Sequence, residues 1–426
     1  MLGNPGSAFR NNVLSHVLYL LEPTTPLKIR ANASMALSRL CAAEFNSIDY
    51  VEYKNHPDPK SLPKFNKKWS KFCKLMFRRN ALDALFHCAM HNSHRHDMSI
   101  AHRHHDDALF SGKLREGAAS SLLYLCAEYR GEVGKIQLTS LVHLLACDSC
   151  VRVQLYAATA IWCCARNLSN RKLIGKLDGA SRLIQVLTNI HDGTTKKRNM
   201  KNKNDAWSPK IQRNLKTWCG LALWLLCCEP ENAVFVAEKK YAISLLIREI
   251  RNHSDSLVKL DPRMIKKQVF SDESARDESA FAQTLIGTLR RVVATSEGKA
   301  VVTRDNLGYT LIDTLFGILN FSPNTELLRE TCGLLFYLQE SPDNLEFIQL
   351  VTNSSTGVED LFLKLLKSRG EGAALLHLES THALAGLCCK NGSKMYIGRS
   401  PNSINQIFEN FCLYNEKLEE ILRQMR

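Results

Sequence analysis

The chain has 426 residues, 45% of them hydrophobic, and its formal net charge at pH 7 is +14. A single compact core rarely grows beyond about 250–300 residues, and no linker rich in Gly, Pro or Ser divides this chain, so a solenoid of stacked repeats is favoured over separate globular domains. No apolar run reaches the roughly 18 residues that span a bilayer, and the excess of positive charge favours an acidic partner, whether an acidic protein segment, nucleic acid or anionic lipid.

The first predicted helical segment is followed by an irregular one. Residues 29–37 combine apolar residues with small ones at helical spacing, as in a helix that packs closely against neighbours. Residues 46–63 are polar and contain several prolines, so they are expected to form an inserted loop.

A basic amphipathic helix is predicted next. Trp69, Phe72 and Met76 share one side of it. The positive charges that surround them form a basic patch: Lys67, Lys68, Lys71, Lys74, Arg78 and Arg79. Such a helix can lie on an anionic membrane or on nucleic acid, but burial of its apolar side in the core is favoured, because residues 81–89 continue a helical pattern.

Histidine is concentrated in a predicted loop, residues 91–107. The weak candidates for metal ligands there are His94, His96, His102, His104 and His105. Their spacing matches no fixed metal motif and no pair of cysteines lies beside them, so a solvated loop is favoured and no metal site or cofactor is expected.

The clearest helical pattern lies in residues 153–187. Apolar residues recur at steps of three and four from Val153 to Leu168, and Ala157 and Ala158 allow neighbouring helices to approach closely. We call a helix of this kind a tight helix. A short helix, a break at Asp178-Gly179 that we assign to a sharp turn at the glycine, and a further amphipathic run follow it.

The tight helix recurs along the chain, each time with a second amphipathic run at a regular offset. Further copies are predicted at residues 29–37, 114–126, 215–227, 281–293, 328–338 and 378–388. From Ala118 to Ala157 is 39 residues and from Cys332 to His382 is 50, close to the roughly 40–47 residues of armadillo and HEAT repeats. Longer gaps are assigned to two more inserted loops, residues 191–209 and 253–278.

On these residues the chain resembles armadillo-repeat proteins over about residues 12–410. The resemblance implies an all-α fold, a right-handed α-solenoid of armadillo-like repeats with inserted polar loops, forming one domain over residues 1–426. It also implies a groove that holds an extended peptide along the tight helices.

Candidate groove residues follow from that resemblance. Positions that match the Trp and Asn pairs of nuclear-import receptors, such as Thr159 and Cys163, keep neither residue, so basic import signals are not expected as ligands. Polar and aromatic residues on the tight helices form the candidate groove: Asn32, Arg39, Glu116, Tyr124, Tyr156 and Trp218. For Trp218 packing between helices is the favoured alternative, and for Arg39 and Tyr124 both roles stay open.

The fifteen cysteines bear on location, because most of them lie inside apolar helical runs. Such cysteines are typical of small core residues kept reduced, which predicts an intracellular protein in the cytoplasm, with the nucleus as an open second location. Cys147 and Cys150 form an isolated CxxC, for which neither a second pair nor a βαβ context is present.

The predicted function is that of a non-catalytic scaffold or adaptor that binds an extended or helical, acidic segment of a protein partner. No phosphate-binding glycine loop, nucleophile elbow or paired carboxylates indicate an enzyme. Two alternatives stay open: a surface at residues 67–79 that binds anionic lipid or nucleic acid, and a regulatory subunit of a larger complex. The sequence does not identify the partner, the oligomeric state, or whether the chain is part of a longer solenoid.

Overall fold

The structure is a computed structural model, and it forms two compact units, Met1–Leu226 (unit 1) and Cys227–Arg426 (unit 2). It describes residues 13–44, 73–74, 76, 81–91, 105–128, 131, 133–146, 150–192, 208–259, 272–304, 307–339, 361, 364–366, 368 and 373–389. The described residues contain helices and no strand, which confirms the predicted all-α class for this part of the chain. The prediction of one continuous domain stays a prediction.

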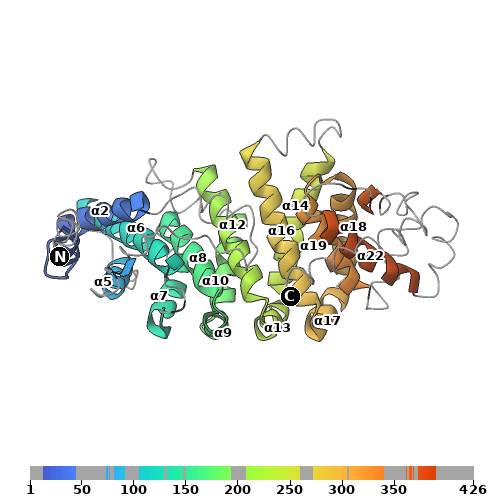
Figure 1. The fold of residues 1–426 in the computed structure, drawn as a ribbon, viewed down its shortest axis with the longest axis horizontal. Coiled ribbons are helices and arrows are strands. Elements are labelled where there is room, and N and C mark those ends of the chain that lie inside the picture. The colour runs from blue at the N-terminus through green and yellow to red at the C-terminus, as the bar shows by residue number, and fades with distance from the viewer. Residues whose placement is uncertain are drawn as a thin grey trace, which may run out of the picture. The chain divides into compact units, whose positions relative to one another are not determined.

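Unit 1 is built from two layers of helices (Figure 1). The predicted tight helices are α2 (Leu27–Glu44), α6 (His105–Glu128), α8 (Val151–Ala165) and α12 (Pro209–Leu226). The second layer contains α5 (Ala81–Ala89), α7 (Lys135–Leu145) and α10 (Gly179–His191). These three helices pack on α6, α8 and α12 respectively, and the short helix α9 (Leu168–Lys176) contacts both layers.

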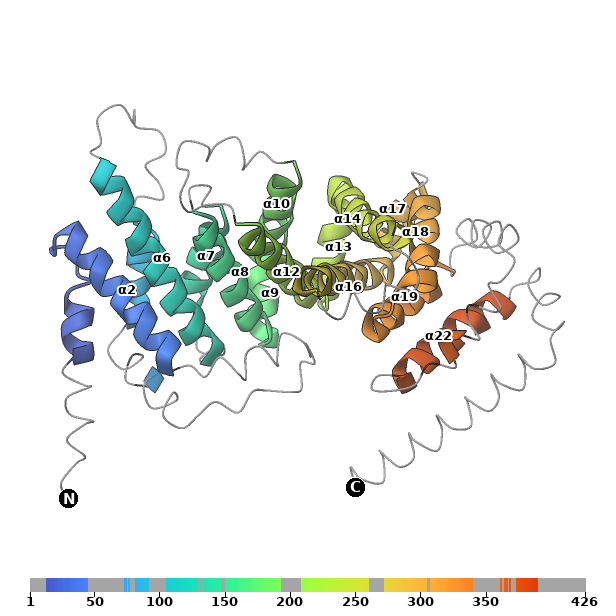
Figure 2. The ribbon, with the colours of Figure 1, turned by 90° about the horizontal axis from the view of Figure 1, so that it is seen from above.

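The tight helices of unit 1 lie side by side and run parallel (Figure 2). Between α2 and α6, the Ser34 hydroxyl donates to the Leu114 carbonyl (2.9 Å) and the Ser38 hydroxyl to the Ser120 hydroxyl (2.9 Å), so residue numbers rise together along both helices. A Cβ atom added at Gly117 would lie 2.5 Å from the Ser34 hydroxyl oxygen and 2.8 Å from the Met35 nitrogen. The small residues therefore allow the close approach that the sequence predicts.

The break before α10 has a different physical basis from the predicted one. Asp178, and not Gly179, adopts the left-handed conformation, with φ of 65°. Gly179 is already the first residue of α10, and a Cβ there would lie 2.8 Å from the Ile174 carbonyl oxygen. The glycine is needed for close packing against α9, while the aspartate makes the turn.

Unit 2 repeats the same order of helices. Its tight helices are α16 (Glu273–Val293), α19 (Thr325–Leu338) and α22 (Ala373–Cys389). The second layer contains α14 (Lys240–Val258) and α18 (Leu307–Phe321), and the short helices are α13 (Pro230–Glu238) and α17 (Ser296–Arg304). The sequence of short, second-layer and tight helix thus occurs as α9–α10–α12, α13–α14–α16 and α17–α18–α19.

The tight helices of unit 2 are also parallel and in contact. The Asn324 amide, at the start of α19, donates to the Ser279 hydroxyl of α16 (2.9 Å), and further along Arg290 of α16 pairs with Glu330 (3.3 Å). Between α19 and α22, the Gln339 amide donates to the Ala383 carbonyl (2.9 Å). Helices that are far apart in sequence but parallel and adjacent in space are typical of stacked repeats.

Two of the predicted loops are shorter than expected. In the predicted loop 253–278, α14 continues to Val258, because His253, Ser254 and Leu257 extend its buried side. At the other end of this loop, α16 already begins at Glu273. The Asp272 carboxylate caps it by accepting a hydrogen bond from the Ser274 N–H (2.9 Å). In the predicted loop 91–107, α6 begins at His105. The predicted loop 46–63 lies outside the described residues, and in 191–209 α10 ends at His191 and α12 begins at Pro209.

The core of both units contains thiols without disulfide bonds. The described cysteines are free, and most are buried. Burial raises the pKa of Cys41 and of Cys332 to about 12, in each case against a smaller opposing effect of a hydrogen bond with a serine. These thiols therefore stay protonated near neutral pH and act as small apolar side chains.

Candidate functional site

Five of the six candidate groove residues retain solvent exposure on the tight helices of unit 1. Asn32 and Arg39 are exposed on α2, while Glu116 and Tyr124 of α6 and Tyr156 of α8 are partly buried. Because positions three, four, seven or eight residues apart share a helix face, Asn32 lies on the same side of α2 as Arg39, and Glu116 on the same side of α6 as Tyr124.

Polar contacts across α6 and α8 involve two of these residues, Glu116 and Tyr156. Glu116 forms an ion pair with Arg152 of α8 (2.8 Å). Tyr156, one turn further along α8, forms a side-chain hydrogen bond with Ser120 of α6. The sequence prediction missed Arg152 and Ser120, although both lie one turn from a candidate on the same helix, which is the signal that would have found them.

The pKa values of both tyrosine hydroxyls are raised. Burial, with a smaller contribution from Tyr156, raises the pKa of Tyr124. Burial and the nearby Glu116 carboxylate raise the pKa of Tyr156, against the opposing charge of Arg152. Both hydroxyls are therefore protonated at neutral pH and able to donate a hydrogen bond.

Trp218 does not present a face to a ligand, contrary to its inclusion in the candidate groove. Its side chain is only 5% exposed and packs edge to face against Trp162 of α8, with ring centroids 5.0 Å apart. Arg166 lies over the Trp162 ring at 5.3 Å, and burial lowers the pKa of Arg166 to about 10. Trp218 therefore fills space between α8 and α12, the favoured alternative for this residue.

The sides of the tight helices that carry the candidate residues share a positive charge, which we call the basic face. It contains five basic side chains and one acidic side chain: Lys28 and Arg39 of α2, Lys113 and Glu116 of α6, and Arg152 of α8 with Arg166 just after it. Lys28 and Lys113 approach the same Phe110 ring, at 5.8 and 5.9 Å from its centroid, which places α2 and α6 cations side by side.

Little within the described structure neutralises the basic face. Its single carboxylate, Glu116, is already paired with Arg152, and no described side chain forms an ion pair with Lys28, Arg39 or Lys113. The other acidic residues of the tight helices of unit 1 are Glu128, which is partly buried, and Glu44, Asp106 and Asp107, whose side chains lie outside those described. Adjacent cations of this kind attract an anionic partner.

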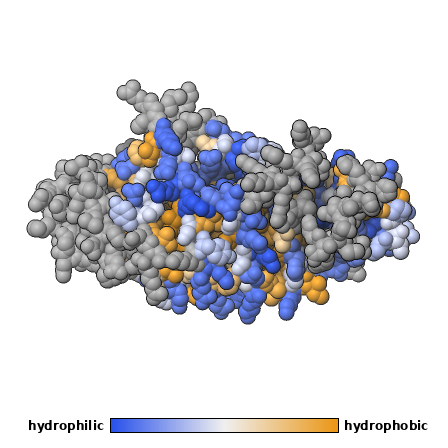
Figure 3. Space-filling view, turned by 180° about the vertical axis from the view of Figure 1, so that it is seen from behind, coloured by the Kyte–Doolittle hydropathy of each residue, from blue (hydrophilic) through white to orange (hydrophobic). Residues whose placement is uncertain are grey.

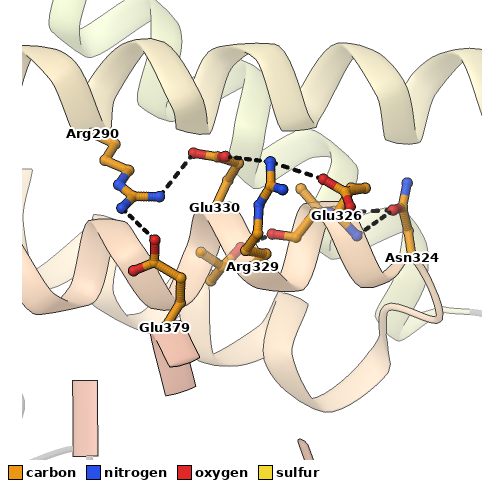
Figure 4. Close-up of polar contacts among 8 residues, drawn as sticks. Arg290, Asn324, Glu326, Arg329, Glu330 and Glu379 are labelled. Atoms are coloured by element: carbon orange, nitrogen blue, oxygen red, sulfur yellow. Dashed lines mark hydrogen bonds and ion pairs between the residues drawn. The ribbon is translucent and has the colours of Figure 1, made fainter. Parts of the chain in front are cut away.

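The tight helices of unit 2 carry a compact charge network (Figure 4). Arg290 of α16 pairs with Glu330 of α19 (3.3 Å) and Glu379 of α22 (2.6 Å), and Arg329 pairs with Glu326 (2.8 Å) and Glu330 (2.9 Å). Two arginines thus face three carboxylates, so this cluster has no positive excess.

The network fits closely between its helices. A Cβ atom at Gly333 would overlap the Arg290 guanidinium, which also lies 5.9 Å from the centroid of the Tyr337 ring. Burial alone would lower the pKa of Arg290, but the carboxylates of Glu330 and Glu379 raise it above its usual value. Arg290 therefore stays charged and joins three tight helices.

The predicted basic patch at residues 67–79 is described at three positions. Cys73 and Met76 are buried and Lys74 is exposed, which agrees with the favoured burial of the apolar side. Lys67, Lys68, Lys71, Arg78 and Arg79 lie outside the described residues.

The weak metal-ligand candidates cannot be placed either, since His94, His96, His102 and His104 lie outside the described residues, as does the side chain of His105. Within the described part of the chain, no group of three or more His, Cys, Asp or Glu side chains is arranged to hold a metal ion.

The described helices and one face of the surface bear on membrane association. Hydrophilic and hydrophobic side chains are interspersed on the face shown in Figure 3. No single described helix is long and apolar enough to cross a membrane, although α12 and α13 taken together meet the criteria of length and composition. Much of α12 is buried against α8, α9 and α10, as in the core helix of a folded unit.

Comparisons with known proteins identify no family. No family model and no curated protein matches the chain. Among solved structures, an engineered protein is similar with a TM-score of 0.45 and 13% identity over 76% of this chain and 96% of that one. A structure from work on a phosphorylation switch in the interaction between cadherin and β-catenin has a TM-score of 0.42 and 12% identity over 90% of this chain and 79% of that one. Both TM-scores are too low to place the chain in a family.

Proposed function

We propose that this chain is a non-catalytic scaffold of armadillo-like repeats that binds an acidic segment of a protein partner on the basic face of unit 1. The observation that carries the proposal is the ratio of five basic side chains to one acidic side chain on that face, on helices packed in parallel. The recurring order of short, second-layer and tight helix supports a right-handed solenoid arrangement within each unit.

The mechanism is electrostatic attraction to a preformed surface. Because the charged side chains project from tight helices that pack through Gly117 and similar small residues, the backbone does not need to rearrange to bind. The positive charge of this face accelerates encounter with an acidic segment, and the Tyr124 and Tyr156 hydroxyls provide uncharged polar groups beside it. We place this function in the cytoplasm, with the nucleus as a second location, where the free thiols stay reduced.

The test measures binding of a fluorescent polyglutamate of about 20 residues to the whole chain by anisotropy. The double variant Lys28→Glu/Lys113→Glu should weaken binding at least tenfold, because each reversal replaces attraction by repulsion. The control Lys135→Glu/Lys176→Glu changes the net charge equally, at exposed positions of α7 and α9, and should weaken binding much less.

Two further probes address the alternative of a binder of nucleic acid or anionic lipid. These are a 20-base-pair DNA duplex and vesicles containing phosphatidylserine, under the same salt conditions. Tighter binding of either than of the acidic peptide, or equal effects of the two double variants on peptide binding, would contradict the proposed function.

A further inference from the structure

The tight helices of unit 1 carry equivalent sets of three residues. Each set has an apolar residue, a small residue seven positions later and a second apolar residue after four more. Aligned on Ala33, Ala118, Ala157 and Cys219, the sets are Ile29, Ala36 and Leu40 in α2; Leu114, Ser121 and Leu125 in α6; Val153, Ala160 and Cys164 in α8; and Leu215, Ala222 and Leu226 in α12.

The sets differ in their exposure to solvent. In α6, α8 and α12 all nine side chains are fully buried. In α2 all three are exposed, Ile29 by 44% and Leu40 by 38%, with Ala36 between them. The same positions are therefore covered on three helices and open on the fourth.

On α6 the set lies against the preceding tight helix. The Leu114 carbonyl accepts from the Ser34 hydroxyl of α2 (2.9 Å), and the Ser121 side chain forms a hydrogen bond with Cys41 of α2. The set thus marks the side on which a tight helix meets the one before it, and none of the described tight helices precedes α2.

The exposed set of α2 points away from α6. Ser34 and Ser38 of α2 contact α6, and at 3.6 residues per turn the three exposed residues lie on average roughly 160° around the helix from these serines. Figure 2 shows α2 at one end of the row of tight helices in unit 1. We call Ile29, Ala36 and Leu40 the end stripe.

The end stripe is suited to a helix. End repeats of a solenoid carry a polar outer face, because an apolar one would be left in water, but α2 keeps the apolar and small residues of an interhelical contact. The element that covers the same set on α6 is a helix. A helix satisfies its own backbone hydrogen bonds, so it can cover a stripe that offers no polar groups.

Charge selects the kind of helix. Lys28 and Arg39 are exposed along one edge of the end stripe. Two copies of this chain that met through their stripes would bring these cations together and would each add a net charge of +14. A helix with carboxylates along one edge pairs with the same cations instead.

We infer that the end stripe is the docking site for an amphipathic α-helix of a partner protein, with small and apolar residues facing α2 and carboxylates beside Lys28 and Arg39. The inference goes beyond the proposed function, because the main contacts are apolar and lie at the end of the helix row, not along the basic face.

The experiment measures binding of labelled 18-residue peptides to the whole chain by anisotropy. The first peptide has Leu or Ala at positions 4, 8, 11 and 15 and Glu along one edge of that side. An isomer of the same composition spreads its apolar residues around the helix, and a third peptide has Lys in place of Glu. We expect the first to bind at least tenfold more tightly than either.

Variants of the chain test the end stripe with a matched control. Ile29→Ser/Leu40→Ser should weaken binding of the first peptide at least tenfold. Ile136→Ser/Leu168→Ser makes the same substitutions at exposed positions of α7 and α9 and should leave binding unchanged. Ala36→Gln keeps a good helix former at an exposed position and should also weaken binding, because its longer side chain occupies the middle of the stripe.

Several outcomes would overturn the inference: no binding of the first peptide, equal binding of the isomer or of the Lys peptide, or equal effects of the two double variants. A native chain that is dimeric by sedimentation, and that Ile29→Ser/Leu40→Ser makes monomeric, would assign the stripe to a second copy. Binding of polyglutamate should not change in Ile29→Ser/Leu40→Ser, so its failure would contradict the proposed function alone.

Discussion

At the scale of single residues, His253 of α14 differs from the other described histidines because it is buried without hydrogen-bond partners. Its side chain is 9% exposed and neither ring nitrogen has a partner. Burial lowers its pKa from 6.5 to about 4. A neutral imidazole fits this place, and a charged one does not.

This burial predicts a loss of stability in acid. Above pH 6.5 His253 is neutral in both the folded and the unfolded chain. Between pH 6.5 and about 4 it binds a proton in the unfolded chain but not in the folded chain. The free energy of unfolding should therefore fall by up to about 3 kcal/mol over that window. Urea unfolding at several pH values measures this effect.

The variants for that measurement are His253→Leu, which should remove part of the decline, and His143→Leu, at an exposed site of α7, which should not. If the free energies of unfolding of His253→Leu and of the native chain differ by the same amount from pH 7 to pH 4, the prediction is wrong.

At the scale of helices, two glycines of α6 should respond oppositely to alanine. Gly117→Ala should destabilise unit 1 by about 1–3 kcal/mol, since the added methyl group meets the backbone of α2 around Ser34 and Met35. Gly112 has no atom within 4 Å of the added Cβ, so Gly112→Ala should be neutral or stabilise the helix by up to about 1 kcal/mol. Thermal unfolding followed by circular dichroism tests both, and equal effects would show that α2 and α6 are not held by this contact.

The sequence was sufficient to predict the helices but not their charge contacts. Each predicted tight helix lies within an observed one to within one residue, because its apolar and small residues recur at helical spacing. The Arg290 network could not be predicted, because it joins α16, α19 and α22, and a pattern within one helix does not show which charges meet across helices. The sequence likewise predicted Glu116 as a candidate but missed Arg152, because their contact joins two different helices.

The sequence also mispredicted which residue makes the turn before α10 and where α16 begins. At Asp178-Gly179 the sequence rule assigns the turn to the glycine. In the structure Gly179 is instead needed where α10 packs against α9, and the left-handed conformation is adopted by Asp178, one position earlier. An aspartate tolerates this conformation better than most residues. The first turns of α16 lie in a polar sequence that resembles a loop, because few of their side chains are buried.

At the scale of the whole molecule, the two units predict where the chain can be divided. Residues 1–226, which end with α12, should unfold cooperatively on their own, because α12 covers α8 and α10. Residues 1–192 lack α12 and expose the apolar sides of α8 and α10, so this fragment should be much less stable or should aggregate. Denaturant unfolding and size-exclusion chromatography compare the two fragments, and equal stability would show that α12 contributes little to unit 1.

The buried thiols have a consequence for the chain as a whole. Alkylating reagents and peroxide attack the thiolate, and burial raises the pKa of Cys41 and Cys332 to about 12, so the folded chain offers almost none at these positions. Oxidation of these two core cysteines should therefore begin in molecules that have already unfolded, and their chemical modification would record past unfolding.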